Sequence, residues 1–142
     1  MLEKRPEYLF VYGTLLAGLR NHHHLKNAQY LGPASVQGAL FELGDYPGLI
    51  LAGHLAMPIG PVLGELYKVE PSNWAQLDAL EAFDPNAIES SMYLRQFVDV
   101  AWLQGTETVM LQAQTYVYNW PLEGRHRIEN GDFRRHLSNK SA

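Results

Sequence analysis

The chain has 142 residues, of which 46% are hydrophobic, and a formal net charge of −4, a composition that fits one globular domain with a packed core. It contains no cysteine, which excludes disulfides, thiolate metal sites and a cysteine nucleophile. The acidic balance argues against a nucleic-acid partner, and no apolar run is long enough to cross a bilayer. Residues 1–7 are charged and lack the apolar centre of a signal peptide, so we expect a cytoplasmic protein without a membrane partner.

The first predicted element is a buried strand over residues 8–12, which are apolar or aromatic. Gly13 ends it, and Thr14 adds a hydroxyl directly after the break. Such an end leaves backbone N–H groups without ladder partners, and a ligand can approach a glycine closely. The turn therefore suits a carboxylate or a developing oxyanion. An ordinary turn after a strand explains the same residues, so this pattern alone leaves both interpretations open.

Short strands and turns are predicted through the next part of the chain. Residues 39–43, 49–52 and 62–69 have the composition of strands, and residues 44–48 form a turn cluster. Glycine and proline punctuate residues 25–39, which favours a connection leading into extended structure. Two prolines within residues 57–61 predict a loop, because proline donates no ladder hydrogen bond.

One helix is predicted with good helical spacing, over residues 74–83. Ser72 or Asn73 can cap its start, and Pro85 ends it. Strands follow at residues 93–102 and 108–118, joined by a hairpin turn at residues 104–106.

The last predicted elements lie at the carboxy-terminal end of the chain. Residues 130–137 favour a single helical turn, and residues 138–142 are expected to fray. We expect one domain over residues 1–142 with a core at about 8–135. Its class is α+β, with a small curled sheet or barrel.

Glu81 is the main candidate for chemistry. It lies seven positions after Trp74 and four after Leu77, so it shares the apolar face of the predicted helix. Desolvation there would raise its pKa toward neutrality, as a general acid/base requires. A glutamate at the margin of an apolar face can also reach water, and Asp78 is a second candidate carboxylate on the same helix.

Several motifs in one order resemble the γ-glutamylcyclotransferase-like (AIG2-like) family. They are Tyr12-Gly13-Thr14-Leu15, Gly38-Ala39-Leu40-Phe41, Tyr46-Pro47-Gly48-Leu49, Gly64-Glu65-Leu66-Tyr67, Leu77-Asp78-Ala79-Leu80-Glu81, Tyr93-Leu94-Arg95 leading into Val98 and Val100, the stretch from Ala113 to Tyr118, and the tail Ile128-Glu129-Asn130-Gly131-Asp132-Phe133-Arg134. Two positions depart from the family pattern: Ala82 stands where glycine is frequent, and Phe41 where tyrosine is common.

The resemblance implies a small mixed β-barrel flanked by helices, and a γ-glutamylcyclotransferase-type enzyme or a related amine-releasing acyltransferase. Such an enzyme releases 5-oxoproline and a free amine when the α-amine of a γ-glutamyl substrate attacks its own γ-carbonyl. By this resemblance Glu81 is the acid/base, and Tyr12, Gly13, Thr14 and Leu15 hold the γ-glutamyl part. No cofactor or metal is implied, because the substrate supplies the nucleophile.

Other side chains allow competing interpretations. Tyr46, Arg95 and Tyr118 are possible pocket residues, although ordinary packing explains both tyrosines, and Arg95 could pair with Asp84 or Asp99 at the surface. His22, His23 and His24 invite a metal, but adjacent histidines rarely converge on one ion. A non-catalytic module that binds a small ligand is the alternative function, favoured if Glu81 points to solvent. A protein that binds other proteins would instead expose a large apolar patch.

Overall fold

The structure is a computed structural model that describes residues 7–53 and 58–141, with side chains to residue 139. Residues 1–6, 54–57 and 142 lie outside the described residues. The signal-peptide expectation and part of the predicted 57–61 loop therefore fall outside them.

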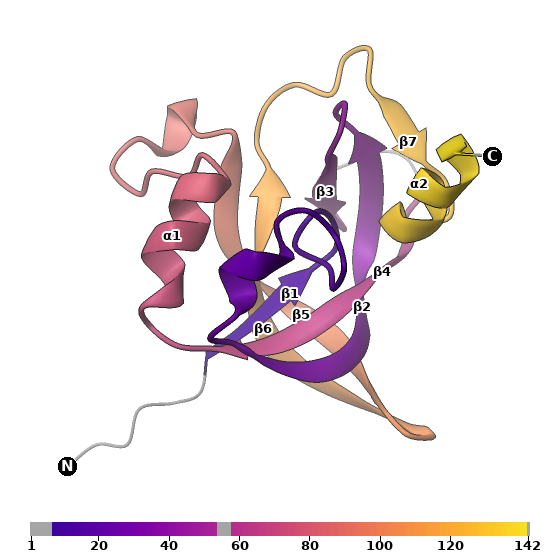
Figure 1. Ribbon diagram of the computed structural model, residues 1–142. Helices are drawn as coiled ribbons and strands as arrows, with labels where there is room; N and C mark the ends of the chain where they lie inside the picture. Colours follow the sequence, from indigo (N-terminus) through magenta and orange to yellow (C-terminus); the bar gives the residue numbers. More distant parts are fainter. Residues whose placement is uncertain (1–6, 54–57, 142) are drawn as a thin grey trace.

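Five strands close into a mixed β-barrel (Figure 1), which confirms the predicted α+β class. The order around the barrel is β2-β4-β1-β6-β5, and β5 returns to β2 through the Ala34–Trp102 and Ser35–Ala101 pairs. The β1–β6 pair is parallel, and the other pairs are antiparallel. These strands are β1 (Glu7–Val11), β2 (Gln29–Glu42), β4 (Gly60–Val69), β5 (Tyr93–Gln104) and β6 (Glu107–Tyr118). Two shorter strands, β3 (Pro47–Leu51) and β7 (His126–Ile128), both pair with β2.

Strand β2 is longer than the sequence predicts, because residues 29–38 belong to it instead of forming a connection. The glycines of β2 do not end the strand; they allow a bulge and a close approach to a neighbouring strand. Gly32 has φ 140° at a register shift in the β2–β4 ladder, which is a bulge. Gly38 lies so close to β3 that a Cβ there would strike the carbonyl oxygen of Ile50.

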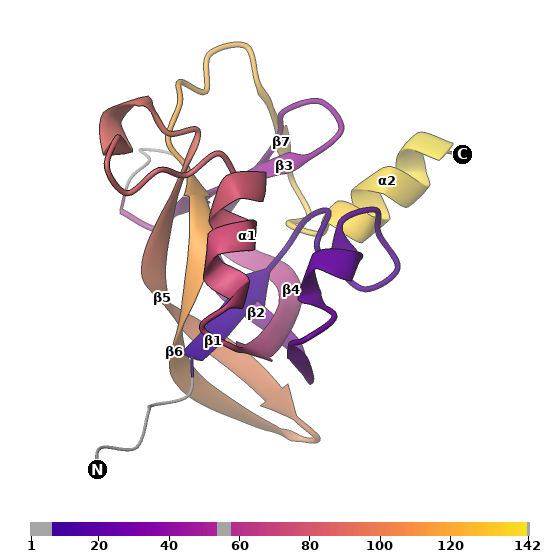
Figure 2. The same ribbon diagram turned by 60° about the vertical axis from the view of Figure 1, so that its left-hand side comes forward.

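Two helices and two short 3₁₀ turns flank the barrel. They are α1 (Asn73–Leu80), α2 (Phe133–Ser141), η1 (His22–Leu25) and η2 (Ile88–Ser90). The loop between β1 and β2, which carries η1, lies between α1 and α2 in both views (Figures 1 and 2). No helix in the described ranges is long and apolar enough to cross a membrane.

Both helices end at other residues than the sequence predicts. α1 ends at Leu80, three residues early, and Ala82 follows with φ 51°. Ser72 makes no side-chain cap; instead the Asn73 side chain accepts the N–H of Glu70 at 2.8 Å. α2 continues to Ser141, where the sequence predicts a single turn and a frayed end.

Candidate active site

A cavity of about 290 Å³ opens where β1 ends, which is small for a ligand site. β1 is buried over Leu9, Phe10 and Val11, and the Thr115 hydroxyl of β6 donates to the Phe10 carbonyl at 3.0 Å. The barrel therefore fixes the position of the turn that follows. The cavity is lined by Phe10, Val11, Tyr12, Gly13, Thr14, Leu15, Arg20, Asn21, Tyr46, Pro47, Leu80, Glu81, Ala82, Met92, Tyr93 and Tyr116.

Residues 12–15, which we call the 12–15 turn, line this cavity and leave backbone donors unused. The carbonyls of Gly13 and Thr14 accept the N–H groups of Leu16 and Asn21, both at 3.0 Å. Within residues 7–53 and 58–141, no hydrogen bond uses the N–H groups of Gly13, Thr14 or Leu15. A Cβ at residue 13 would lie 2.7 Å from the Pro47 ring, so glycine is needed here. These free donors are suited to an anionic oxygen.

Glu81 comes directly after α1 and lines the same cavity. Its N–H donates to the Leu77 carbonyl at 3.0 Å, which continues the helical turn. In the described part of the chain, no hydrogen bond or ion pair engages its carboxylate. Burial raises the pKa of Glu81 to about 7. The carboxyl group can thus exchange a proton near neutral pH beside the 12–15 turn.

Buried tyrosines form much of the remaining wall. The Tyr12 hydroxyl donates to the Tyr116 carbonyl at 2.5 Å, and the Tyr93 hydroxyl donates to the Pro47 carbonyl at 2.6 Å. Burial raises the pKa of Tyr12, Tyr93 and Tyr116 above the ordinary tyrosine value. These phenols therefore stay neutral, and all three hydroxyls donate hydrogen bonds to other groups of the protein. Tyr46 also lines the cavity, as predicted for a possible pocket residue.

Asp78 and Arg95 lie outside the cavity lining. The Tyr116 hydroxyl donates to Asp78 Oδ1 at 2.6 Å, and Arg95 Nη1 lies 3.6 Å from the same oxygen. The Arg95 guanidinium also covers the Trp74 ring at 4.4 Å. Arg95 thus pairs with Asp78 rather than with the two aspartates expected from the sequence. Since Asp78 is engaged in this way, Glu81 is the carboxylate that the cavity contains.

Tyr118 also lies outside the cavity lining. Its ring packs edge-on against Tyr93, with the ring centroids 5.6 Å apart. Tyr118 therefore packs against the cavity residue Tyr93 and does not line the cavity itself.

The adjacent histidines contact the backbone of the same loop and a neighbouring helix. His22 Nδ1 and His23 Nδ1 lie 3.0 Å from the carbonyls of Leu15 and Arg20, and Gln76 lies 2.8 Å from His24 Nδ1. No cluster of three metal-ligating side chains occurs in the described part of the chain.

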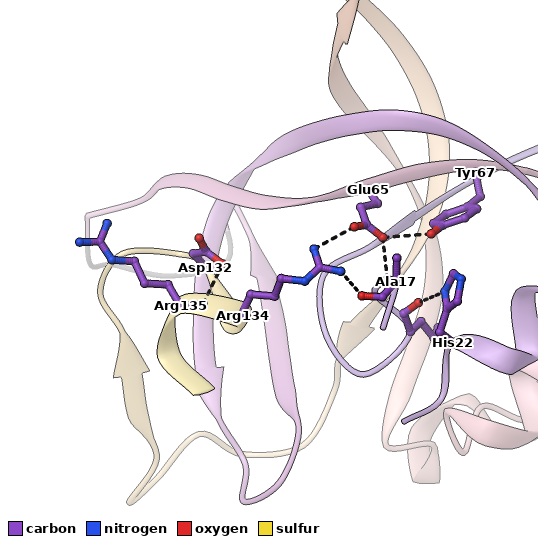
Figure 3. A network of polar contacts seen from close by, with 8 residues as sticks. Ala17, His22, Glu65, Tyr67, Asp132, Arg134 and Arg135 are labelled. Carbon is purple, nitrogen blue, oxygen red and sulfur yellow. Dashed lines mark hydrogen bonds and ion pairs between the residues drawn. The ribbon is translucent and has the colours of Figure 1, made fainter. Parts of the chain in front are cut away.

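A polar network around the buried Glu65 anchors the loop at Ala17 (Figure 3). Glu65, on β4, accepts the Ala17 N–H at 2.9 Å and the Tyr67 hydroxyl at 3.0 Å on Oε1. Arg134 of α2 donates to Glu65 Oε2 at 2.9 Å, and its second Nη donates to the Ala17 carbonyl. β4 places Glu65 opposite Val11, just before the 12–15 turn. The network therefore joins α2, the barrel and the loop that forms the cavity.

Some cavity residues were not predicted from the sequence. Arg20, Asn21, Met92, Tyr93 and Tyr116 reach the cavity through the tertiary fold. Asn21 follows the 12–15 turn closely enough to have been a candidate. No local pattern distinguishes Met92 or Tyr116 from ordinary packing.

Comparison with known proteins identifies the family of the chain. The family described as "Gamma-glutamyl cyclotransferase, AIG2-like" matches residues 9–135. The chain belongs to this family. The Gamma-glutamylcyclotransferase family protein YtfP of Escherichia coli K12 is 34% identical over 126 residues, covering 88% of this chain and 94% of YtfP. The Gamma-L-glutamyl-butirosin B gamma-glutamyl cyclotransferase of Niallia circulans is 36% identical over 113 residues, covering 78% of this chain and 66% of the relative.

Solved structures share the fold of this AIG2-like chain. YkqA from Bacillus subtilis has a TM-score of 0.71 at 26% identity, covering 97% of this chain and 44% of YkqA. An AIG2-like protein from Mus musculus has a TM-score of 0.61 at 22% identity, covering 92% of this chain and 96% of the mouse protein. With its family assigned, the chain is a cyclotransferase-like enzyme.

Proposed function

We propose that the chain releases 5-oxoproline and a free amine from a γ-glutamyl compound, with Glu81 as the general acid and base. The observation that carries this proposal is the position of Glu81. Its carboxyl group, with a pKa of about 7, lines the same small cavity as the unused N–H groups of the 12–15 turn. Relatives whose names refer to γ-glutamyl cyclotransfer support the same reaction.

The chemistry needs one proton to move between two nitrogens. The neutral α-amine of the substrate attacks the γ-carbonyl carbon, and a new C–N bond closes the five-membered ring. The attacking nitrogen then passes its extra proton to the Glu81 carboxylate. Glu81 passes that proton to the leaving nitrogen, the original C–N bond breaks, and the amine departs. General acid–base catalysis of this kind contributes about 10²–10⁴-fold.

The 12–15 turn has the complementary role in this proposal. Its free N–H groups bind the oxyanion that forms on the γ-carbonyl oxygen, or the α-carboxylate of the glutamyl group. The narrow cavity keeps the glutamyl chain folded so that amine and carbonyl meet. Tyr12 contributes its ring and backbone, because its hydroxyl already donates to Tyr116. The substrate supplies the nucleophile, so the reaction needs no cofactor.

The experiment is to measure 5-oxoproline release from γ-glutamyl-alanine, γ-glutamyl-ε-lysine, a γ-glutamyl alkylamine and glutathione. We expect release of 5-oxoproline and the free amine in equal amounts from at least one compound. Binding of these compounds without release from any of them would contradict the proposal and favour a non-catalytic binding module.

A further inference from the structure

A second cavity, of about 440 Å³, adjoins the active-site cavity. Thr14 and Arg20 line both, so the two cavities meet at these residues. We call this second cavity the outer cavity. Its other lining residues come from the loop, the β2–β3 turn and α2: Leu19, Gly44, Asp45, Phe133 and Leu137.

Arg20 carries the positive charge at this junction. Among the described residues, it is the one cationic side chain lining the active-site cavity. No hydrogen bond or ion pair in residues 7–53 and 58–141 engages its guanidinium. The guanidinium is thus available to an anionic group of a ligand.

The reaction determines which substrate group reaches Arg20. The glutamyl α-carboxylate and the attacking amine are bonded to the same α-carbon. The α-carboxylate therefore stays beside Glu81 and the 12–15 turn when the amine attacks. Substituents of the leaving nitrogen have no such restriction and extend away from the closing ring. Because Thr14 and Arg20 line both cavities, a substituent on the leaving nitrogen has space on this side, in the outer cavity.

We infer that the outer cavity is the subsite for the leaving amine, and that Arg20 there binds the carboxylate of a leaving amino acid. This inference rests on the proposed function. The substrate class is then γ-glutamyl amino acids rather than γ-glutamyl alkylamines. Leu19 and Leu137, which are partly exposed, offer apolar surface to the leaving side chain.

Two substrates that differ in one group test this role. γ-Glutamyl-ethylamine is γ-glutamyl-alanine without the leaving carboxylate. We expect Arg20→Met to lower kcat/KM for γ-glutamyl-alanine by about 10-fold or more, the usual scale of a charged hydrogen bond, and to change kcat/KM for γ-glutamyl-ethylamine little. Arg125→Met, at an exposed arginine outside both cavities, is the matched control. Equal losses for both substrates, or no loss for either, would overturn the inference.

Binding separates this inference from the proposed reaction. Glutaryl-alanine and N-ethylglutaramate lack the α-amine and cannot cyclise. Calorimetry should show tighter binding of glutaryl-alanine to the wild type, and Arg20→Met should abolish that preference. Such a preference without 5-oxoproline release from any substrate would count against the proposed function alone. Release without an Arg20-dependent preference would overturn the inference alone, and neither binding nor release would overturn both.

Discussion

Glu81 occupies a place where ionisation costs free energy. Its pKa is raised from 4.5 to about 7 by burial, so the folded protein holds the proton more tightly than the unfolded chain. Below pH 4.5 the carboxyl group is protonated in both states and has no effect. Between pH 4.5 and 7 the unfolded state binds fewer protons, so stability falls as pH rises, and the penalty is complete above about pH 7.

Glu81→Gln should therefore stabilise the protein in a pH-dependent way. Above pH 7 we expect a gain of about 2–3 kcal/mol in the free energy of unfolding, reduced from the full shift because Glu81 is only half-buried. The gain should shrink toward zero at pH 4.5. Denaturant titrations at several pH values measure it, with Glu89→Gln at the exposed surface as the control for a lost charge. A gain that does not depend on pH would mean that ionisation of Glu81 costs the fold nothing.

Ala82 holds the backbone conformation that turns the chain after Glu81. Its φ of 51° is the one positive value at a non-glycine residue in the described ranges. The left-handed region costs a residue with a Cβ about 1 kcal/mol or more. This explains in physical terms why the related family frequently has glycine at this position.

Ala82→Gly should stabilise the protein by about 1 kcal/mol, because glycine adopts this conformation without strain. Ala75→Gly, at an exposed helical position of α1, should destabilise it by about the same amount. Thermal unfolding of both variants makes the comparison. Destabilisation by both would show that the positive φ at Ala82 carries no strain.

At the scale of elements, the Glu65 network links the carboxy-terminal helix to the active-site loop. The Glu65 side chain is 8% exposed, and its ionic partner Arg134 is 43% exposed. Without Arg134, a nearly buried carboxylate would lose its cation, and Ala17 would lose a contact to α2. The loop should then hold the 12–15 turn less firmly.

Arg134→Met is expected to lower stability by about 1–2 kcal/mol and to raise KM more than it lowers kcat. Arg135→Met is the matched control, since the Arg135 guanidinium points away from the network in Figure 3. Steady-state kinetics and denaturant titration measure both effects. An unchanged KM in a destabilised Arg134→Met variant would leave the network a purely structural role.

The elements also show what sequence patterns predict well. Residues 8–12, 62–69 and 108–118 were expected as strands, and all three lie in strands of the barrel, apart from Tyr12, which begins the turn. The pattern failed for β2, because a bulge at Gly32 and a close approach at Gly38 resemble loop signals when read locally. α1 ended early because the chain turns at Ala82, before Pro85 is reached.

The candidate site likewise contains residues that the sequence pattern predicts and residues that it does not. Helical spacing predicts Glu81 on the inner face, and the motif pattern indicates the 12–15 turn. Both line one cavity. Arg95 was misjudged because its partners Asp78 and Trp74 depend on how α1 packs against β5. Arg20 was missed for a related reason, since an exposed arginine carries no local signal of the cavity beside it.

On the scale of the whole molecule, the barrel wall is tightly packed where β4 runs beside the end of β1. A Cβ at Gly64 would strike the Val11 carbonyl oxygen and lie 2.7 Å from the Phe10 ring. Both contacts belong to the strand that carries the 12–15 turn. The closeness of these strands therefore helps to fix the position of the cavity.

Gly64→Ala should destabilise the protein by about 1–3 kcal/mol, because two packed strands would have to separate. Gly60→Ala, in the same strand, has no neighbour within 4 Å of the added Cβ and serves as the control. The midpoint of denaturant unfolding distinguishes them. Equal stability of the two variants would mean that β1 and β4 separate easily at this point.

The most direct test of the proposed mechanism compares 5-oxoproline release by the wild type and by Glu81→Gln, once both are shown to be folded. Glutamine keeps the size of the side chain and removes its acid–base function. We predict a rate about 10²–10⁴-fold lower for Glu81→Gln, and an unchanged rate for the Glu89→Gln control. Equal release by the wild type and Glu81→Gln would contradict the assignment of Glu81 as the general acid and base.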